Sequence, residues 1–350
     1  MLLGTRLAAA SAPYPTNEKV DFSSAQNTDA CLDGVDGGVT SLDSLRVTTT
    51  SRGSLAAESE ERAQLQARAS LHGDQRGMAA GASMSGWSVW GAGGLSRYES
   101  TVDIAPYESD SYRLLMGAER LFGNNYLAGF TLGVESTDTD TTYNGGGQDR
   151  SGINFSLYGA MLINDVFSVD GGFGYGSAET DENRIDTGSN RAGGGATPGA
   201  TIKGNYDSDR AFGTINLNAV KAYGAWVVGA RLGALHVVES QDGYTESGGT
   251  GRRTIGSRHV DLTQAYASLE LGYSLNAFEP YALVGYRNDL SRDDGNSAGG
   301  LPAGIRTQPN DDDDWQGGLG VRYFGTNGVT GSVEWLRTFG RKKFDEDTCR

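Results

Sequence analysis

The chain has 350 residues, of which 53 are glycine and 21% are charged, and its formal net charge is -15 at pH 7. No stretch approaches the roughly 18 consecutive apolar residues of a membrane-spanning helix, so the sequence excludes a helical membrane protein. The negative charge also argues against a nucleic-acid partner, because phosphate binding needs clustered cations.

Residues 1–54 are rich in Ser, Thr, Asp and Gly and have little periodicity, which predicts a disordered stalk. The first residues are a poor signal peptide, because Arg6 interrupts a short apolar run. We therefore expect either a true start further upstream or a chain that is a fragment.

Residues 55–84 are interpreted as a linker that contains one helix, Leu55 to Leu71, with strong helix formers and no Gly or Pro. The segment is polar nearly all round, and at about 1.5 Å per residue it reaches roughly 25 Å, the height of the apolar band of a membrane barrel. Two interpretations stay open: a helix inside a hydrated pore, or a solvated connecting helix.

Residues 85–350 contain segments of about ten residues that alternate apolar and polar side chains, a pattern typical of membrane barrels. We expect an all-β fold, a twelve-stranded antiparallel transmembrane β-barrel. Its strands are predicted near 86–98, 110–120, 125–137, 150–163, 166–178, 210–221, 225–238, 260–275, 278–288, 314–324 and 329–340, with a twelfth from about Thr348.

The last of these strands would stop at Arg350, although about ten residues are needed to cross the membrane. The sequence therefore predicts a last strand that is cut short, and unpaired backbone edges on the first and eleventh strands.

The connections alternate in length. Five tight turns are expected at 122–124, 164–165, 222–224, 276–277 and 325–328, and five long acidic loops at 99–109, 138–149, 179–209, 239–259 and 288–313. Short turns on one rim and long loops on the other are the outer-membrane arrangement, periplasmic and extracellular respectively.

The alternation also assigns each side chain to a face. Apolar residues such as Phe130, Ile153 and Trp226 are expected to face lipid. Nearly every charge falls on the opposite face, and since a charge on the lipid face costs about 2–4 kcal/mol at mid-membrane, that face must be the interior. The residues expected to line the pore are Arg113, Glu119, Glu135, Asp170, Arg231, Glu270, Glu279, Arg287, Arg322 and Glu334.

Aromatic residues near the strand ends would form the two interfacial girdles of such a barrel. They are Trp87, Tyr112, Tyr126, Tyr175, Tyr273, Tyr286, Trp315 and Tyr323. A simpler alternative is that aromatic residues occur there because they pack well in strands.

Several segments resemble the β-domain of bacterial autotransporters, the type V secretion family. They are GWSVWGAGGLSRY, YRLLMGAERLFGNNYLAGFTLGVES, INFSLYGAMLINDVFSVDGGFGYG, YASLELGYSLNAFEPYALVGY and GGLGVRYFGTNGVTGSVEWLRTFGRKKFDED, and the resemblance covers about residues 86–350. It implies a translocator that is anchored in the bacterial outer membrane, among its lipid and lipopolysaccharide, with help from the barrel-assembly machinery. The translocator would carry its own N-terminal passenger to the cell surface, of which residues 1–54 would be a remnant, and keep the linker helix in the pore.

Some relatives cut this linker with acidic interior residues at an Asn-Asn site. Here Asn124 and Asn125 are adjacent, but they fall in an expected tight turn, so self-cleavage is not expected.

Two other functions stay open on the same fold: a porin-like channel, and a surface adhesin whose acidic loops bind a ligand. The run Asp311 to Asp314 raises the possibility of calcium, but a solvated loop is the simpler interpretation. A soluble all-β propeller or sandwich would also alternate.

No enzyme is indicated, and we expect no catalytic, cofactor-binding or metal-binding residues. The three histidines, His72, His236 and His259, are isolated, and no hydrolase or metalloprotease motif occurs. Cys31 and Cys349 are far apart in polar segments, which argues against a disulfide framework and a thiolate metal site.

Overall fold

A computed structural model describes residues 87–101, 106–122, 125–141, 145–186, 199–249, 252–293, 312–324, 330–340 and 344–350. The expected stalk (1–54) and the expected helix Leu55 to Leu71 lie outside the described residues. No helix in the part of the chain that is described is long and apolar enough to cross a membrane.

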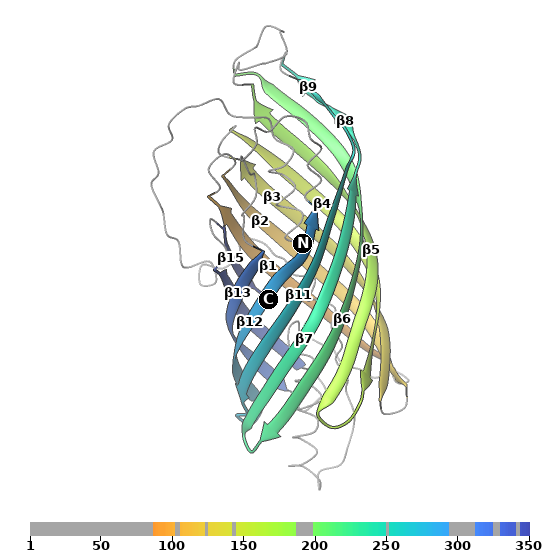
Figure 1. The fold of residues 1–350 in the computed structure, drawn as a ribbon, viewed down its shortest axis with the longest axis vertical. Helices are drawn as coiled ribbons and strands as arrows, with labels where there is room; N and C mark the ends of the chain where they lie inside the picture. The colour runs from red at the N-terminus through yellow and green to blue at the C-terminus, as the bar shows by residue number, and fades with distance from the viewer. Residues whose placement is uncertain are drawn as a thin grey trace.

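Twelve antiparallel strands form a closed barrel. Figure 1 shows that the strands are tilted relative to the long axis of the barrel. Each strand pairs with the next along the chain, and β1 also pairs with β15, which closes the ring. The strands are β1 (Trp87–Ser100), β2 (Tyr107–Phe122), β3 (Tyr126–Thr141), β4 (Gly146–Leu162), β5 (Phe167–Ile185), β6 (Thr201–Tyr223), β7 (Trp226–Gln241), β11 (Arg258–Tyr273), β12 (Phe278–Asp293), β13 (Asp313–Phe324), β14 (Thr330–Phe339) and β15 (Phe344–Cys349). This confirms the expected fold class.

The last strand differs from its prediction. β15 begins at Phe344, before the expected Thr348, and pairs with Leu95–Ser100 of β1 and with Trp335–Thr338 of β14. The expectation that the first and eleventh strands keep unpaired edges is therefore wrong over the length of β15. The sequence did not predict the start of this strand, because FDEDTC is highly charged. The inward-facing carboxylate of Glu346 finds its cationic partner only in the folded barrel. Cys349 is disulfide-bonded, which the cysteine positions did not predict.

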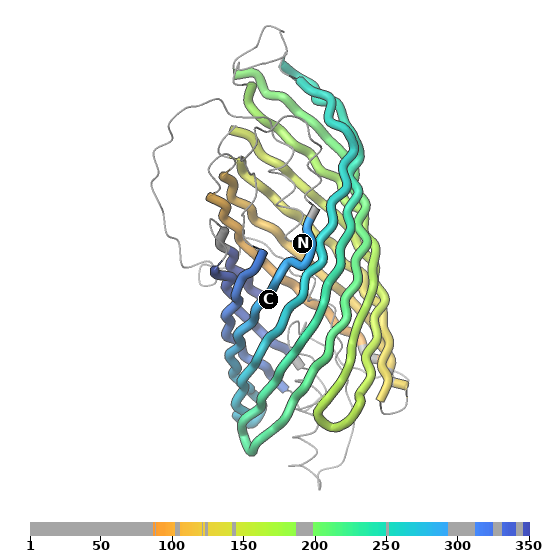
Figure 2. The backbone as a smooth tube through the Cα atoms, viewed as in Figure 1, coloured from red at the N-terminus to blue at the C-terminus, as the bar shows by residue number. Residues whose placement is uncertain are grey.

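Several expected long loops are strands instead. β5 and β6 pair from Phe167↔Ala219 to Ile185↔Thr201 and project far beyond the rest of the barrel (Figure 2). The expected loop 138–149 contains only a short connection between the ends of β3 and β4, and the expected loop 239–259 carries β8 (Tyr244–Thr245), β9 (Ser247–Gly248) and β10 (Thr254–Ile255). Beyond the membrane both faces of a strand can be polar, so these strands continue past the last residues that alternate between apolar and polar. The sequence pattern therefore predicted strands that were too short.

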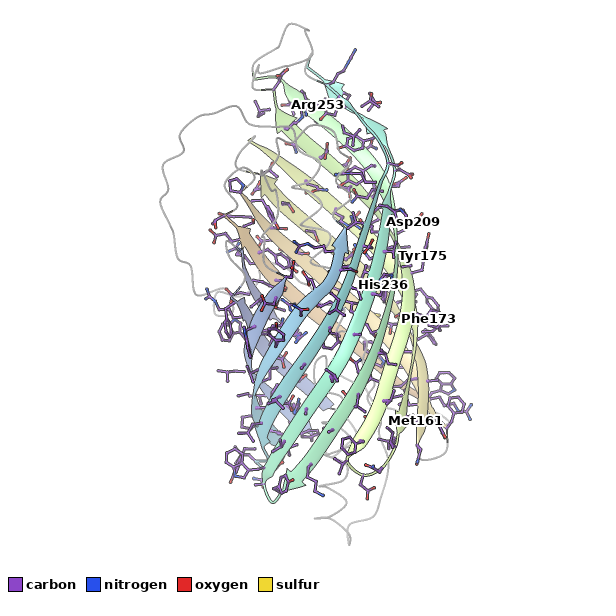
Figure 3. The ribbon with its side chains drawn as sticks, viewed as in Figure 1. Met161, Phe173, Tyr175, Asp209, His236 and Arg253 are labelled. Carbon is purple, nitrogen blue, oxygen red and sulfur yellow. The ribbon has the colours of Figure 1, made fainter. Side chains whose placement is uncertain are left out.

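The outer surface is an apolar belt. Ile153, Phe173 and Leu232 are 66%, 65% and 58% exposed, and Phe173 points away from the barrel wall in Figure 3 together with Met161 and Tyr175. An apolar surface of this extent is unfavourable in water and favourable in contact with lipid. This exposure agrees with the expected facing of the strands.

Aromatic pairs lie near both ends of this belt. We call the end of the barrel with the tight turns the short-turn rim. At this rim Trp226 packs against Tyr273, with ring centroids 4.8 Å apart. Tyr286 packs against Trp315 at 5.1 Å toward the opposite end, the long-loop rim. Both the expected girdles and the alternative, that aromatic residues pack well in strands, are compatible with these pairs.

Candidate functional site: the polar interior of the barrel

The charged residues that the alternation assigned to the interior are all buried or half-buried in the structure. Glu119, Glu279 and Arg322 are 1%, 0% and 1% exposed, and Arg113, Arg287 and Glu334 are also buried. Glu135, Asp170, Arg231 and Glu270 are half-buried. The structure distributes these ten residues over separate clusters, each of which spans several strands.

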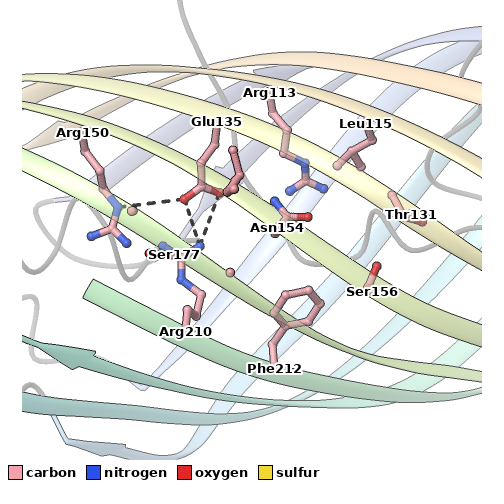
Figure 4. Close-up of a pocket in the computed structure, with 13 residues that line it drawn as sticks. Arg113, Leu115, Thr131, Glu135, Arg150, Asn154, Ser156, Ser177, Arg210 and Phe212 are labelled. Atoms are coloured by element: carbon pink, nitrogen blue, oxygen red, sulfur yellow. Dashed lines mark hydrogen bonds and ion pairs between the residues drawn. The ribbon is translucent and has the colours of Figure 1, made fainter. Parts of the chain in front are cut away.

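The first cluster, here named the central arginine cluster, consists of Arg113, Glu135, Arg150, Arg210 and Glu239. Figure 4 labels Arg113, Glu135, Arg150 and Arg210. Arg150 donates from both terminal nitrogens to the Glu239 carboxylate at 2.9 and 3.1 Å, and the Nε of Arg210 donates to the same carboxylate at 2.9 Å. Arg210 also lies 3.2 Å from Glu135. These five residues come from β2, β3, β4, β6 and β7, on the half of each strand nearer the long-loop rim.

A second cluster lies near the short-turn rim. Arg322 forms ion pairs with Glu270 and Glu279, the latter at 2.8 Å, and its guanidinium lies 3.9 Å from the ring centroid of Tyr281. The Tyr281 hydroxyl donates to Glu334 at 2.6 Å, and Arg350 lies 2.7 Å from Glu334. Four strands and the residue that follows β15 are joined in this way.

The remaining predicted residues form smaller networks. Arg287 contacts Asp314 at 2.7 Å and Glu346 at 3.3 Å. Glu119 accepts a hydrogen bond from Tyr158 at 2.9 Å. Asp170 accepts bonds from Asn216 and Asn218 at 2.7 and 2.6 Å, and Arg231 donates to Asn218 at 2.9 Å.

The sequence missed Arg150, Arg210 and Glu239 as interior residues, because it placed them at strand starts or in loops. A signal was available. Glu239 lies eight residues after the inward-facing Arg231 on the same strand, so continuing the alternation by even steps past the apolar belt would have found it.

Two interior tyrosine rings lie directly against glycines of the barrel wall. A Cβ on Gly320 would overlap the ring of Tyr281, and a Cβ on Gly129 would overlap that of Tyr158. Both rings are held by hydrogen bonds to buried glutamates. Only glycine leaves the space that lets these rings lie flat on the neighbouring strand.

Outside the membrane, the projecting strands have a small polar core of their own. Tyr206 stacks on Tyr244 with centroids 5.0 Å apart, and Arg184 pairs with Glu246 at 2.7 Å. Burial, together with the neighbouring Glu182 carboxylate, raises the pKa of the Tyr244 phenol, so it stays protonated and donates to Glu182.

Within the described ranges, no group of three or more His, Cys, Asp or Glu side chains is placed to hold a metal ion. His236 and His259 are exposed and hydrogen-bond to Thr263 and Ser240 on the outside of the barrel. The site therefore consists of a polar, ion-paired interior inside an apolar exterior.

A closed β-barrel with this inside-out polarity defines the class of outer-membrane β-barrels. Residues 89–335 match the family model described as autotransporter beta-domain, and the chain belongs to this family. No curated protein sequence matches the chain.

The solved structures that are similar to this one include two autotransporter domains. The translocator domain of the autotransporter NalP from Neisseria meningitidis is 17% identical, with a TM-score of 0.63 over 76% of this chain and 87% of that one. The beta domain of the Bordetella autotransporter BrkA is 15% identical, with a TM-score of 0.55 over 76% of this chain and 99% of that one. At these identities the likeness shows the fold, and the family match shows an outer-membrane translocator domain.

Proposed function

We propose that this barrel carries its own N-terminal segment through the outer membrane and exports or displays it at the cell surface. In this proposal residues 85–350 are the membrane anchor, residues 55–84 the linker with its helix in the pore, and residues 1–54 the passenger remnant or stalk. The observation that carries the proposal is a closed barrel whose buried side chains include many polar and charged groups, in a chain of the autotransporter family.

The ten charged residues assigned from the alternation would then line the pore, and the long-loop rim would be extracellular, with the tight turns in the periplasm. Lipid and lipopolysaccharide would surround the apolar belt, and the barrel-assembly machinery would insert it. No catalytic step is needed, because the barrel supplies only a membrane-crossing path.

Deleting residues 1–84 tests this proposal. The deletion variant should fold, since its barrel is closed by its own strands, and should show higher conductance in planar bilayers than the full chain. Heat-modifiable migration in gel electrophoresis reports folding independently. Equal conductance of the two folded proteins would contradict a linker inside the pore and would favour the solvated-helix alternative.

A further inference from the structure

The interior of the barrel carries a small group of charges close to the short-turn rim, here named the acidic mouth. It consists of Asp170, Glu270, Glu279 and Arg322, each of which lies within three residues of a strand end at this rim. At about 3.3 Å per residue, the four side chains start within about 10 Å of the rim, measured along their strands. They come from β5, β11, β12 and β13, so they face the interior from different sides of the wall.

Asp170 contributes a negative charge that no cation balances. Its carboxylate accepts hydrogen bonds from the side-chain amides of Asn216 and Asn218 at 2.7 and 2.6 Å, and no ion pair joins it to any residue that the structure describes. Amides are neutral, so they fix the orientation of the carboxylate and leave its charge in place. The side chain is half-buried, and part of it therefore remains accessible from the interior.

Glu270 and Glu279 contribute a second negative charge, because they share one guanidinium. Arg322 pairs with both carboxylates, and Glu279 is fully buried whereas Glu270 is half-buried. The acidic mouth thus combines three carboxylates with a single arginine. The other inward-facing charges that the structure describes near this rim are two of each sign and leave the balance unchanged: Glu119, Glu334, Arg231 and Arg350.

We propose, building on the proposed function, that the acidic mouth makes the pore of this barrel selective for cations. Fixed charges that line a narrow aqueous passage attract ions of the opposite sign and repel ions of the same sign. The low-dielectric wall strengthens this effect by focusing the field into the passage. Asp170 and Glu270 determine the selectivity, since they are the two carboxylates of the mouth that remain accessible from the interior.

The reversal potential of the open pore in a KCl gradient tests the proposal. In planar bilayers near 0.1 M salt, the open events of the full chain should show that K⁺ is more permeant than Cl⁻ by at least about threefold. The preference should shrink near 1 M salt, where the screening length falls from about 10 Å to about 3 Å.

Two substitutions assign the selectivity to the mouth. D170N/E270Q removes both excess charges and keeps one carboxylate, Glu279, for Arg322, so the barrel should still fold and should lose at least half of the preference for K⁺. The single variants D170N and E270Q should each lose part of it. D138N removes a carboxylate beyond the apolar belt, far from the mouth, and should change the preference less than D170N does. Heat-modifiable migration verifies that each barrel is folded.

The possible failures are distinguishable. Open events without a preference for K⁺, or with a preference for Cl⁻, would overturn this inference and leave the proposed function standing. A preference for K⁺ that D170N/E270Q leaves intact would also overturn it, because other charges would then set the selectivity. If neither the full chain nor the variant without residues 1–84 conducts although both are folded, the proposed function itself is wrong.

Discussion

Arg322 stacks on the ring of Tyr281 at 3.9 Å while forming ion pairs with Glu270 and Glu279. Removing the cation would leave the buried Glu279 and the half-buried Glu270 without their counter-charge, which costs about 3–5 kcal/mol. We therefore expect R322Q to lower the free energy of unfolding by about that amount in urea titrations of the barrel in lipid vesicles.

The control for R322Q is R97Q, which breaks an exposed ion pair with Asp110 at 3.0 Å. Exposed pairs contribute about 0–1 kcal/mol, so R97Q should be nearly neutral. If R322Q and R97Q lowered the free energy of unfolding by similar amounts, the ion pairs of Arg322 would contribute no more to stability than an exposed pair.

Replacing Gly320 with alanine is expected to destabilise the barrel, because even a methyl group does not fit at this position. The ring of Tyr281 occupies the space of a Cβ at this position, and it is pinned between Arg322 and Glu334, so it has no free direction in which to move. G320A should destabilise the barrel by about 1–3 kcal/mol, as overpacking does. G256A, where nothing lies within 4 Å of the added Cβ, should have little effect in the same titration. A neutral G320A would contradict the pinned ring.

Aspartates form a row across β2, β3 and β4 beyond the apolar belt, where Asp138 lies opposite both Asp110 and Asp149. Partial burial, and then the neighbouring carboxylates, raise the pKa of Asp138 above its ordinary value of 3.8. At neutral pH the folded state therefore carries a repulsion that protonation removes. Stability should rise as pH falls through the folded pKa, and the gain should be complete below 3.8.

D138N removes this repulsion at every pH. The variant should melt at a higher temperature than the wild type at pH 7, and the difference should shrink as the pH approaches 4. D165N, in the turn between β4 and β5, is the control and should change the melting temperature at pH 7 less than D138N does. A lower melting temperature for D138N at pH 7 would show that the row is bound to a cation or otherwise stabilising.

The two rims should be distinguishable from outside the cell. An epitope tag inserted at Gly193, between β5 and β6, should bind antibody on intact cells. The same tag at Asn164, in the tight turn between β4 and β5, should bind only after the outer membrane is permeabilised. Labelling at Asn164 alone would invert the proposed orientation.

The sequence predicted the barrel well because strands that cross lipid must alternate, and the alternation of Phe130, Thr131 and Leu132 continues from strand to strand. The same alternation predicted that Arg322 and Glu334 point inward, and both side chains are buried in the structure. It missed the projecting parts of β5 and β6, because outside lipid no apolar face marks a strand. It missed most of β15 because the inward carboxylate of Glu346 has its cationic partner only in the folded barrel. The sequence also could not predict which charged residues pair with one another, since partners such as Arg150 and Glu239 are 89 residues apart in sequence.

The central claim is that the N-terminal segment crosses the membrane through this barrel, and surface labelling of that segment tests it most directly. The full chain, expressed behind a cleavable export signal and tagged at Gly38, should bind antibody on intact cells and lose the tag to external protease. The barrel itself should remain folded and protected. A folded barrel whose Gly38 tag is reached only after permeabilisation would contradict the account.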